Sequence, residues 1–191
     1  IRLGLVGSEM CIRDRTFATR HPEGALFCFR GGLRSEIAQQ WLQHAGVDFP
    51  RIKGGYKAMR RWLIDASDNL ISSGHLLLVG GPTGAAKTRL LNKGNAGNPI
   101  PGSIDLEGLA NHRGSAFGRR VTEQPTQIGF ELAFGAQLIK HRCNGHQKLI
   151  LEDEGRLIGR CALPPALQSA RGDADWVQLD ASIEALSLIH I

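Results

Sequence analysis

The chain has 191 residues, of which 42% are hydrophobic and 21% are charged, a balance typical of a globular protein and unlike that of disordered, collagen-like or coiled-coil chains. No apolar run approaches the ~18 residues of a membrane span, so we expect no membrane contact. Lysine plus arginine outnumber aspartate plus glutamate by 23 to 18, and a net charge of +5 suits a polyanionic partner without requiring one.

The chain contains four widely spaced cysteines and no C-x-x-C pair: Cys11, Cys28, Cys143 and Cys161. This spacing matches neither a disulfide scaffold nor a zinc framework. We therefore expect a reducing, cytoplasmic setting and no bound metal among the cysteines.

Both ends of the chain differ from the rest of it in sequence pattern. Residues 1–15 have no hydrophobic period and no signal-peptide core, and residues 186–191 stop in the middle of a helix-like pattern. Both segments resemble translated adaptor or vector sequence, so we expect them to be non-native, with ordinary frayed termini as the alternative.

Short apolar runs alternate with segments of helical spacing along the rest of the chain. Strands are predicted at residues 25–29, 75–79, 103–106, 148–152 and 176–179, and weakly at 47–52. Helices are predicted at residues 35–44, 56–71 and 128–139, and from residue 88 onward. This alternation predicts an α/β fold with a mainly parallel sheet, and S-S-G before residue 75 predicts a domain boundary.

Cys28 ends the first predicted strand and opens the segment C-F-R-G-G-L-R-S. Gly31 and Gly32 let the backbone curl so that several N–H groups face one point, where the following helix also directs its positive end. Arg30 and Arg34 add positive charge. These surroundings favour a thiolate and would stabilise an anionic adduct on sulfur, so we expect a catalytic Cys28 with both arginines as anion holders. The alternative is an inert cysteine at a strand end.

The segment G-G-P-T-G-A-A-K-T follows the strand predicted at residues 75–79. Gly81, Gly84, Lys87 and Thr88 fit the phosphate-loop pattern, in which backbone N–H groups wrap a phosphate, the lysine meets its charge and the hydroxyl meets any magnesium ion. Ala86 replaces a glycine of the pattern, which weakens binding only if that position needs positive φ. A plain strand–turn–helix junction is the alternative.

Acidic residues end the strand predicted at residues 148–152. In phosphate-loop folds such an acid often orients metal or water, and the candidates are Glu152, Asp153 and Glu154, which the sequence does not separate. The alternative is a solvated acidic turn.

His112 and Arg113 lie in the glycine-flanked loop N-H-R-G-S-A-F-G. Such a pair can hold phosphate or another anion, so both are candidate substrate-binding residues, with ordinary loop residues as the alternative. A third group, H-R-C-N-G-H at residues 141–146, has metal-like side chains but no standard ligand spacing, so we predict no metal there.

The cysteine loop resembles the active-site loop of the rhodanese family, which implies a cysteine that carries sulfur or selenium. The chain resembles the tRNA 2-selenouridine synthase family in the order of five segments. They are the cysteine loop, K-G-G-Y-K-A-M-R-R-W, the phosphate loop, D-L-E-G-L-A-N-H-R-G-S-A-F-G and E-D-E-G-R-L-I-G-R. The resemblance implies part of a rhodanese-like domain at residues 16–73 and an incomplete P-loop NTPase-like domain at 74–185, with the family's sequence truncated at both ends.

The resemblance further implies a transferase that replaces sulfur by selenium in the wobble 2-thiouridine of tRNA. Selenophosphate would supply selenium, and a geranyl group from geranyl diphosphate would first be attached to the sulfur, making it a better leaving group. No tightly bound cofactor is implied, and magnesium is optional. Two other interpretations stay open: an inactive tRNA-binding fragment, and a P-loop kinase or NTPase with an accessory sulfurtransferase-like domain.

Overall fold

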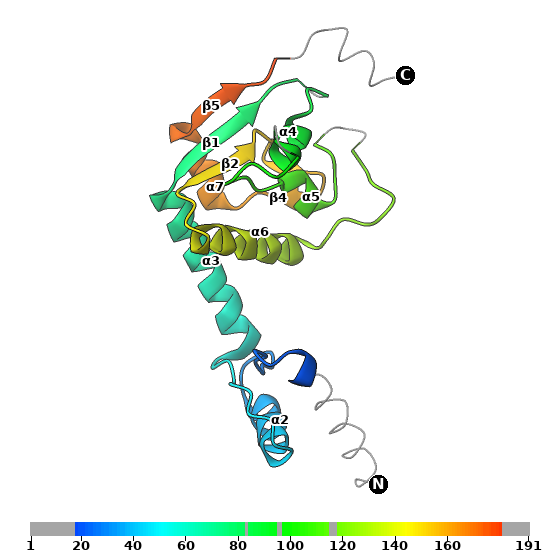
Figure 1. Cartoon of the computed structure of the whole chain (residues 1–191), viewed down its shortest axis with the longest axis vertical. Coiled ribbons are helices and arrows are strands. Elements are labelled where there is room, and N and C mark those ends of the chain that lie inside the picture. The colour runs from blue at the N-terminus through cyan, green and yellow to red at the C-terminus, as the bar shows by residue number, and fades with distance from the viewer. Residues whose placement is uncertain (1–17, 83, 95–96, 115–117, 181–191) are drawn as a thin grey trace. The chain divides into compact units, whose positions relative to one another are not determined.

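The computed structural model describes residues 18–82, 84–94, 97–114 and 118–180 (Figure 1). The segments predicted to be non-native, 1–15 and 186–191, lie outside these ranges. The chain divides into two compact units between Trp62 and Leu63, and each is described by itself. The division falls inside helix α3, Gly55–Ser73, and so before the boundary predicted at residues 73–74.

The strand predicted at residues 25–29 is wrong. Leu26 alone makes a parallel bridge, with Arg51, through hydrogen bonds of 2.8 Å from Leu26 N to Pro50 O and from Ile52 N to Leu26 O. Phe27 and Phe29 are about half exposed, at 52% and 50%. A run of apolar residues becomes a buried strand only where neighbouring strands and a packed face cover it, and a single bridge provides neither.

The two helices of this region are confirmed. Helix α2 spans Leu33–His44, beginning two residues before the predicted start, and Gly46 at φ +81° ends it in the left-handed conformation expected of a glycine stop. Helix α3 extends the segment predicted at residues 56–71 by one or two residues at each end.

The second unit is built on a three-stranded parallel sheet of order β2–β1–β5 (Figure 1). Its strands are β1 (His75–Gly80), β2 (Lys148–Glu152) and β5 (Asp175–Gln178), each within one residue of its predicted bounds. His75 pairs with Lys148 at one end and Val79 with Glu152 at the other. The parallel α/β prediction is therefore confirmed for this unit.

The remaining elements surround the sheet. They are α4 (Lys87–Lys93), α5 (Leu106–Ala110), α6 (Gln127–Cys143), the hairpin β3 (Leu157–Ile158) and β4 (Cys161–Ala162), α7 (Pro165–Ala170) and the 3₁₀ turn η1 (Arg171–Asp173).

The prediction of a strand at residues 103–106 is wrong, since only Ser103 of this segment forms a bridge, to Ile150. Asp105 instead caps α5 by accepting a hydrogen bond of 2.6 Å from Gly108 N, which starts a helix at Leu106.

The core of the second unit lies between α6 and the sheet. Phe130, Phe134 and Leu138 recur at four-residue spacing on one helix face and are at most 1% exposed. They belong to one cluster with Leu76, Leu78, Leu149 and Leu151 of β1 and β2. Burying each such side chain contributes about 1.5–3 kcal/mol, which fixes the sheet and the loops that leave it. Among the described helices, none combines the length and apolar character needed to cross a bilayer.

Ala86 gives the first testable prediction. It precedes α4 with φ +61° and ψ +29°, a left-handed conformation that costs a residue with a Cβ about 1–2 kcal/mol. We expect Ala86→Gly to raise the free energy of unfolding by about 0.5–1 kcal/mol, because glycine's greater freedom in the unfolded chain offsets part of the relief. Urea denaturation measures the change. Ala85→Gly is the matched control: Ala85 is buried without positive φ, so its substitution should be destabilising. A loss of stability in both variants would contradict strain at Ala86.

Candidate functional site

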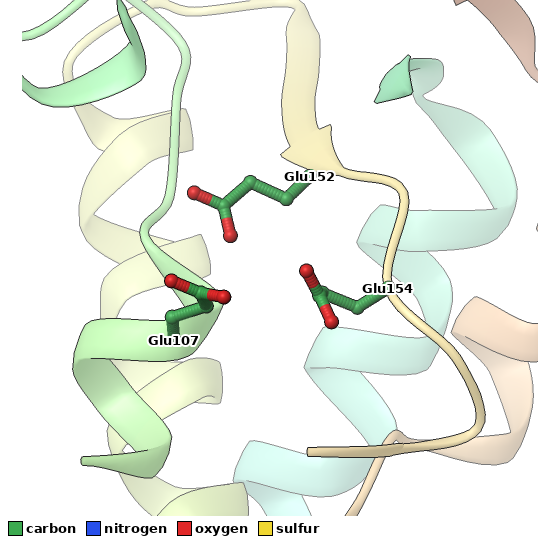
Figure 2. Close-up of side chains that lie close together, drawn as sticks. All are labelled: Glu107, Glu152 and Glu154. Carbon is green, nitrogen blue, oxygen red and sulfur yellow. The ribbon is translucent and has the colours of Figure 1, made fainter. Parts of the chain in front are cut away.

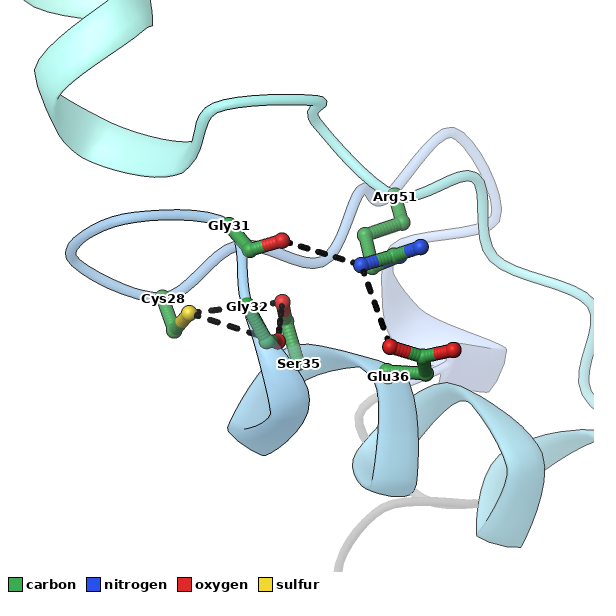
Figure 3. A network of polar contacts seen from close by, with 6 residues as sticks. All are labelled: Cys28, Gly31, Gly32, Ser35, Glu36 and Arg51. Atoms are coloured by element: carbon green, nitrogen blue, oxygen red, sulfur yellow. Dashed lines mark hydrogen bonds and ion pairs between the residues drawn. The ribbon is translucent and has the colours of Figure 1, made fainter.

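The first candidate site is the loop that carries Cys28 (Figure 3). The Ser35 hydroxyl lies 3.3 Å from Cys28 Sγ and donates to it, and also lies 2.9 Å from the carbonyl oxygen of Gly32. Ser35 is buried in the first turn of α2, with 3% of its surface exposed, so its hydroxyl is held in place beside the sulfur.

These contacts lower the pKa of the Cys28 thiol to about 6. The largest cause is the Ser35 hydroxyl, which outweighs the opposing effect of burial, and backbone N–H groups of Ser35, Arg30 and Gly32 add to it. The guanidinium groups of Arg30 and Arg34 are not among the causes. Cys28 is thus mainly a thiolate at neutral pH, as the sequence predicts, but through hydrogen bonds rather than through arginine charge.

The loop keeps its shape through contacts with the segment K-G-G-Y. Tyr56 N donates to Cys28 O at 2.9 Å, and Gly31, at φ +67°, leaves no room for a side chain against Gly54 and Gly55. A Cβ on Gly55 would lie 2.0 Å from Cys28 O. Gly31 and Gly55 are therefore required by the close approach of the cysteine loop to the start of α3.

Arg51 is a site residue that the sequence did not single out. Its Nη1 donates to Gly31 O at 2.9 Å and lies 3.9 Å from a carboxylate oxygen of Glu36 on α2 (Figure 3). It therefore ties the cysteine loop to the helix that carries Ser35. A lone arginine in an irregular segment gives no sequence signal for this role.

The second candidate site is the loop between β1 and α4. Gly81 and Gly84 have φ of +144° and +88°, so the backbone takes turns that favour glycine at both predicted positions. Lys87 Nζ donates to Gly81 O at 3.0 Å and to Pro82 O at 3.4 Å, so the lysine folds back over the loop. Gly81, Gly84 and Lys87 thus lie in one loop at the end of β1, where the sequence places them.

Three glutamates converge beside this loop (Figure 2). One oxygen from each of Glu107, Glu152 and Glu154 lies within 4.8 Å of the others. Thr88 Oγ1 donates to Glu107 Oε2 at 3.0 Å, which joins the cluster to the first turn of α4. Sequence reasoning missed Glu107; the only signal was its place in the segment D-L-E-G-L-A.

Glu152 is the most unusual member of the cluster. It is 1% exposed, and neither carboxylate oxygen has a hydrogen-bond partner within the part of the chain that the structure describes. Burial raises its pKa to about 7 against a smaller opposing effect of the nearby Thr88 hydroxyl, which donates to Glu107, and the charges of Glu107, Asp105 and Glu154 add to the rise. Burial likewise raises the pKa of Glu154. Two buried acids aimed at one point make a site suited to a cation or a proton.

The structure separates the three acids that the sequence could not. Asp153 forms an ion pair with Arg171 and accepts a hydrogen bond of 3.3 Å from Trp176 Nε1. Its carboxylate therefore fastens β5 and the 3₁₀ turn to the end of β2. Glu152 and Glu154 face Glu107 instead (Figure 2).

The candidates His112 and Arg113 do not act as a pair. His112 is 8% exposed and lines a groove together with Arg119, Arg120 and Arg160. Arg113 is exposed and does not line the groove. Adjacent residues of an extended segment point to opposite sides, which explains the difference.

Comparison with known proteins places these sites in a family. Residues 74–187 match the family model described as the tRNA 2-selenouridine synthase AAA domain. The chain belongs to the tRNA 2-selenouridine synthase family. No solved structure matches the chain.

Curated members of the tRNA 2-selenouridine synthase family are similar along most of the chain. The proteins so named from Marinobacter nauticus and Hahella chejuensis are 49% and 52% identical over 170 and 171 residues, 89% of this chain in each case and 45% and 44% of those proteins. The one from Pseudomonas fluorescens is 52% identical over 157 residues, 82% of this chain and 42% of that protein. The chain thus spans less than half the length of these relatives. A match over 170 of 191 residues necessarily includes Cys28 as well as the phosphate loop.

The Cys28 thiolate gives a prediction on pH dependence. Because hydrogen bonding lowers its pKa to about 6, the rate of Cys28 alkylation by iodoacetamide should rise through a midpoint near pH 6 and then level off. Ser35→Ala removes the largest cause, so the midpoint should move to higher pH and the rate at pH 6 should fall several-fold. Peptide mass spectrometry isolates the Cys28 signal from the other cysteines.

Ser72→Ala is the control, because the Ser72 hydroxyl bonds only within α3, to Asp68 O at 2.8 Å. It should leave the Cys28 profile unchanged. A Ser35→Ala profile that coincides with the wild-type curve would refute the role of the serine hydroxyl.

Proposed function

We propose that this chain contributes both chemical sites of a tRNA-modifying transferase, which replaces sulfur by selenium in wobble 2-thiouridine. The observation that carries the proposal is the Cys28 thiolate, held by Ser35, within a chain that matches relatives named for 2-selenouridine synthesis. A thiolate is the nucleophilic form of cysteine. Cys28 therefore acts in selenium transfer, in a rhodanese-like loop, with Arg30 and Arg34 near the anionic group.

The phosphate loop binds the phosphorylated substrates of this reaction. Support comes from the positive φ of Gly81 and Gly84, which suits a loop that wraps an anion, and from Lys87, whose ammonium group contacts two loop carbonyls. A phosphate would be a stronger partner for the ammonium group than a neutral carbonyl. The diphosphate of geranyl diphosphate and the phosphate of selenophosphate both meet this requirement, and Thr88 lies beside them.

The two sites suit two successive substitutions. The sulfur of 2-thiouridine attacks the first carbon of the geranyl chain and diphosphate leaves, its charge balanced by Lys87. The selenium of selenophosphate then attacks the base carbon that bears the geranylated sulfur, and geranyl thiolate departs and takes a proton. Water then cleaves the phosphorus–selenium bond, which releases phosphate and leaves selenium on the base. A neutral thiol leaves more readily than sulfide, which is the chemical reason for alkylating the sulfur first.

The glutamate cluster fits a magnesium ion that would serve the same loop. Glu152 offers two buried oxygens that make no hydrogen bond to the described residues, and Glu107 and Glu154 complete a set of the hard oxygen ligands that Mg²⁺ prefers. When bound, the ion would neutralise charge on the phosphate groups. Thr88, which donates to Glu107, links the cluster to the phosphate loop.

Magnesium binding is testable by thermal denaturation at pH 8, above the pKa of about 7 of Glu152. Added Mg²⁺ should stabilise the wild-type chain, by about 2.7 kcal/mol at a concentration of 100 times Kd. Glu152→Gln should lose most of this effect, because it removes a buried charge at the centre of the cluster. Asp65→Asn, which removes an exposed carboxylate from α3, should keep it. Equal stabilisation of all three proteins would argue against the site.

The function itself is tested by mass spectrometry of thiolated tRNA incubated with the chain, geranyl diphosphate and selenophosphate. The wild type should yield geranylated and selenium-containing wobble uridine. Cys28→Ser should stop selenium incorporation and leave geranylation intact, while Lys87→Ala should slow geranylation at least tenfold. Cys143→Ser and Lys93→Ala alter exposed residues and serve as matched controls.

Three outcomes would contradict the proposal. Normal selenium incorporation by Cys28→Ser would exclude the role of the cysteine. Nucleotide hydrolysis that ignores tRNA would instead indicate a P-loop kinase or NTPase. Binding of tRNA with no transfer at all would indicate an inactive fragment.

A further inference from the structure

A basic groove lies in the second unit, outside the phosphate loop and the glutamate cluster. It has a volume of about 510 Å³ and is bounded by the loop at His112, the segment 119–124 and the turn at Gly159 and Arg160. Arg119, Arg120 and Arg160 supply three positive charges to its lining, and Glu123 supplies one negative charge. None of the tRNA-modifying chemistry proposed above uses these residues.

The three arginines are available to a ligand. Among the described residues, no carboxylate forms an ion pair with any of them, and all three are exposed. Arg160 contacts the backbone carbonyl of Gln124, a neutral acceptor that leaves its charge uncompensated. A guanidinium in this state is a strong partner for phosphate oxygens, because its planar donors match them in pairs.

The inner wall of the groove contains a buried nitrogen, His112 Nδ1, that has no hydrogen-bond partner among the described residues. His112 is 8% exposed, and its Nδ1 makes no hydrogen bond to the described residues. An unsatisfied buried nitrogen is costly unless a ligand or water reaches it. A ligand with hydrogen-bonding oxygens in this arginine-rich groove could supply the missing partner.

Hydrogen bonds between its walls hold the shape of the groove. Asn111, at φ +49°, donates through its side-chain nitrogen to Thr122 O at 3.1 Å and to Glu123 O at 3.0 Å. Gln124 donates to Ala110 O at 2.9 Å and accepts from Arg160 N at 3.0 Å. These bonds hold both sides of the groove in register, so a ligand would not have to order the backbone.

Close contact between the two sides of this loop explains why residue 118 is a glycine. A Cβ on Gly118 would lie 1.7 Å from Arg113 O and 2.9 Å from the His112 ring, so only glycine lets the loop close beside Arg119. His112, one of the two residues that the sequence marks as a candidate anion site, thus lines this groove.

We propose that this groove binds a backbone phosphate of the tRNA, an inference that rests on the tRNA substrate of the proposed function. Its lining contains one large apolar residue, Val121, and so offers no channel for an isoprenoid chain. It is wide enough for more than a single phosphate and gathers three arginines in its lining, as polynucleotide-backbone sites do. The groove positions the RNA, and the chemistry takes place elsewhere.

The test is binding of fluorescently labelled, unmodified tRNA, followed by anisotropy at several salt concentrations. The double variant Arg119→Gln/Arg120→Gln and the single variant Arg160→Gln should bind more weakly, and the slope of log K against log salt should fall by about one for each phosphate that is no longer neutralised. Lys140→Gln removes one exposed positive charge from α6, outside the groove, and should retain the wild-type slope. The substituted side chains are exposed, so unchanged melting temperatures are expected.

The outcomes separate this inference from the proposed function. If the wild type binds tRNA and the arginine variants bind with the same affinity and slope, the groove inference is wrong and the proposed function stands. If the wild type does not bind tRNA, the proposed function fails and the inference fails with it. If the variants keep tRNA binding but lose binding of inorganic pyrophosphate, the groove serves a small diphosphate instead and the inference is overturned.

Discussion

The parallel pairing of β1 with β2 and β5 is the constraint on which the second unit depends. In this register Val79 lies opposite Glu152 and Val177, so all three strands end at one edge of the sheet. The phosphate loop leaves β1 at that edge, and the acids leave β2 beside it. The core of α6 residues packed on the sheet keeps these ends together, so the proximity of lysine loop and glutamates follows from strand pairing and burial.

The surroundings of Cys28 and of Glu152 shift the pKa values of these two groups in opposite directions. Around Cys28, a hydroxyl and backbone N–H groups favour the anion and lower the pKa of the thiol. Around Glu152, burial and neighbouring carboxylates disfavour the anion and raise the pKa of the acid. Cys28 and Glu152 both titrate near neutral pH. The charge of the Cys28 thiolate is stabilised by hydrogen bonds within the chain, whereas the charge of Glu152 is compensated by a cation or a proton from outside.

Several residues that the sequence presents as equivalent have different tasks in the folded chain. Asp153 joins β5 to the end of β2 through Arg171 and Trp176, while Glu152 and Glu154 on either side face Glu107. Likewise His112 enters a groove and Arg113 points to solvent. Alternation of side chains along extended backbone places neighbouring residues in different surroundings.

Local patterns in the chain were sufficient to predict the parallel α/β order, the bounds of β1, β2 and β5, and both glycine-bearing loops, because backbone period and glycine placement are local properties. The same patterns wrongly predicted strands at 25–29 and 103–106, where cover by other strands and a capping Asp105 decided the outcome. Only packing in three dimensions brought Glu107 to Glu152 and set Arg51 on the cysteine loop, since residues so far apart in the chain meet in no other way. Packing also decided that Ser35 activates Cys28, because a hydrogen bond depends on where the first turn of α2 comes to rest.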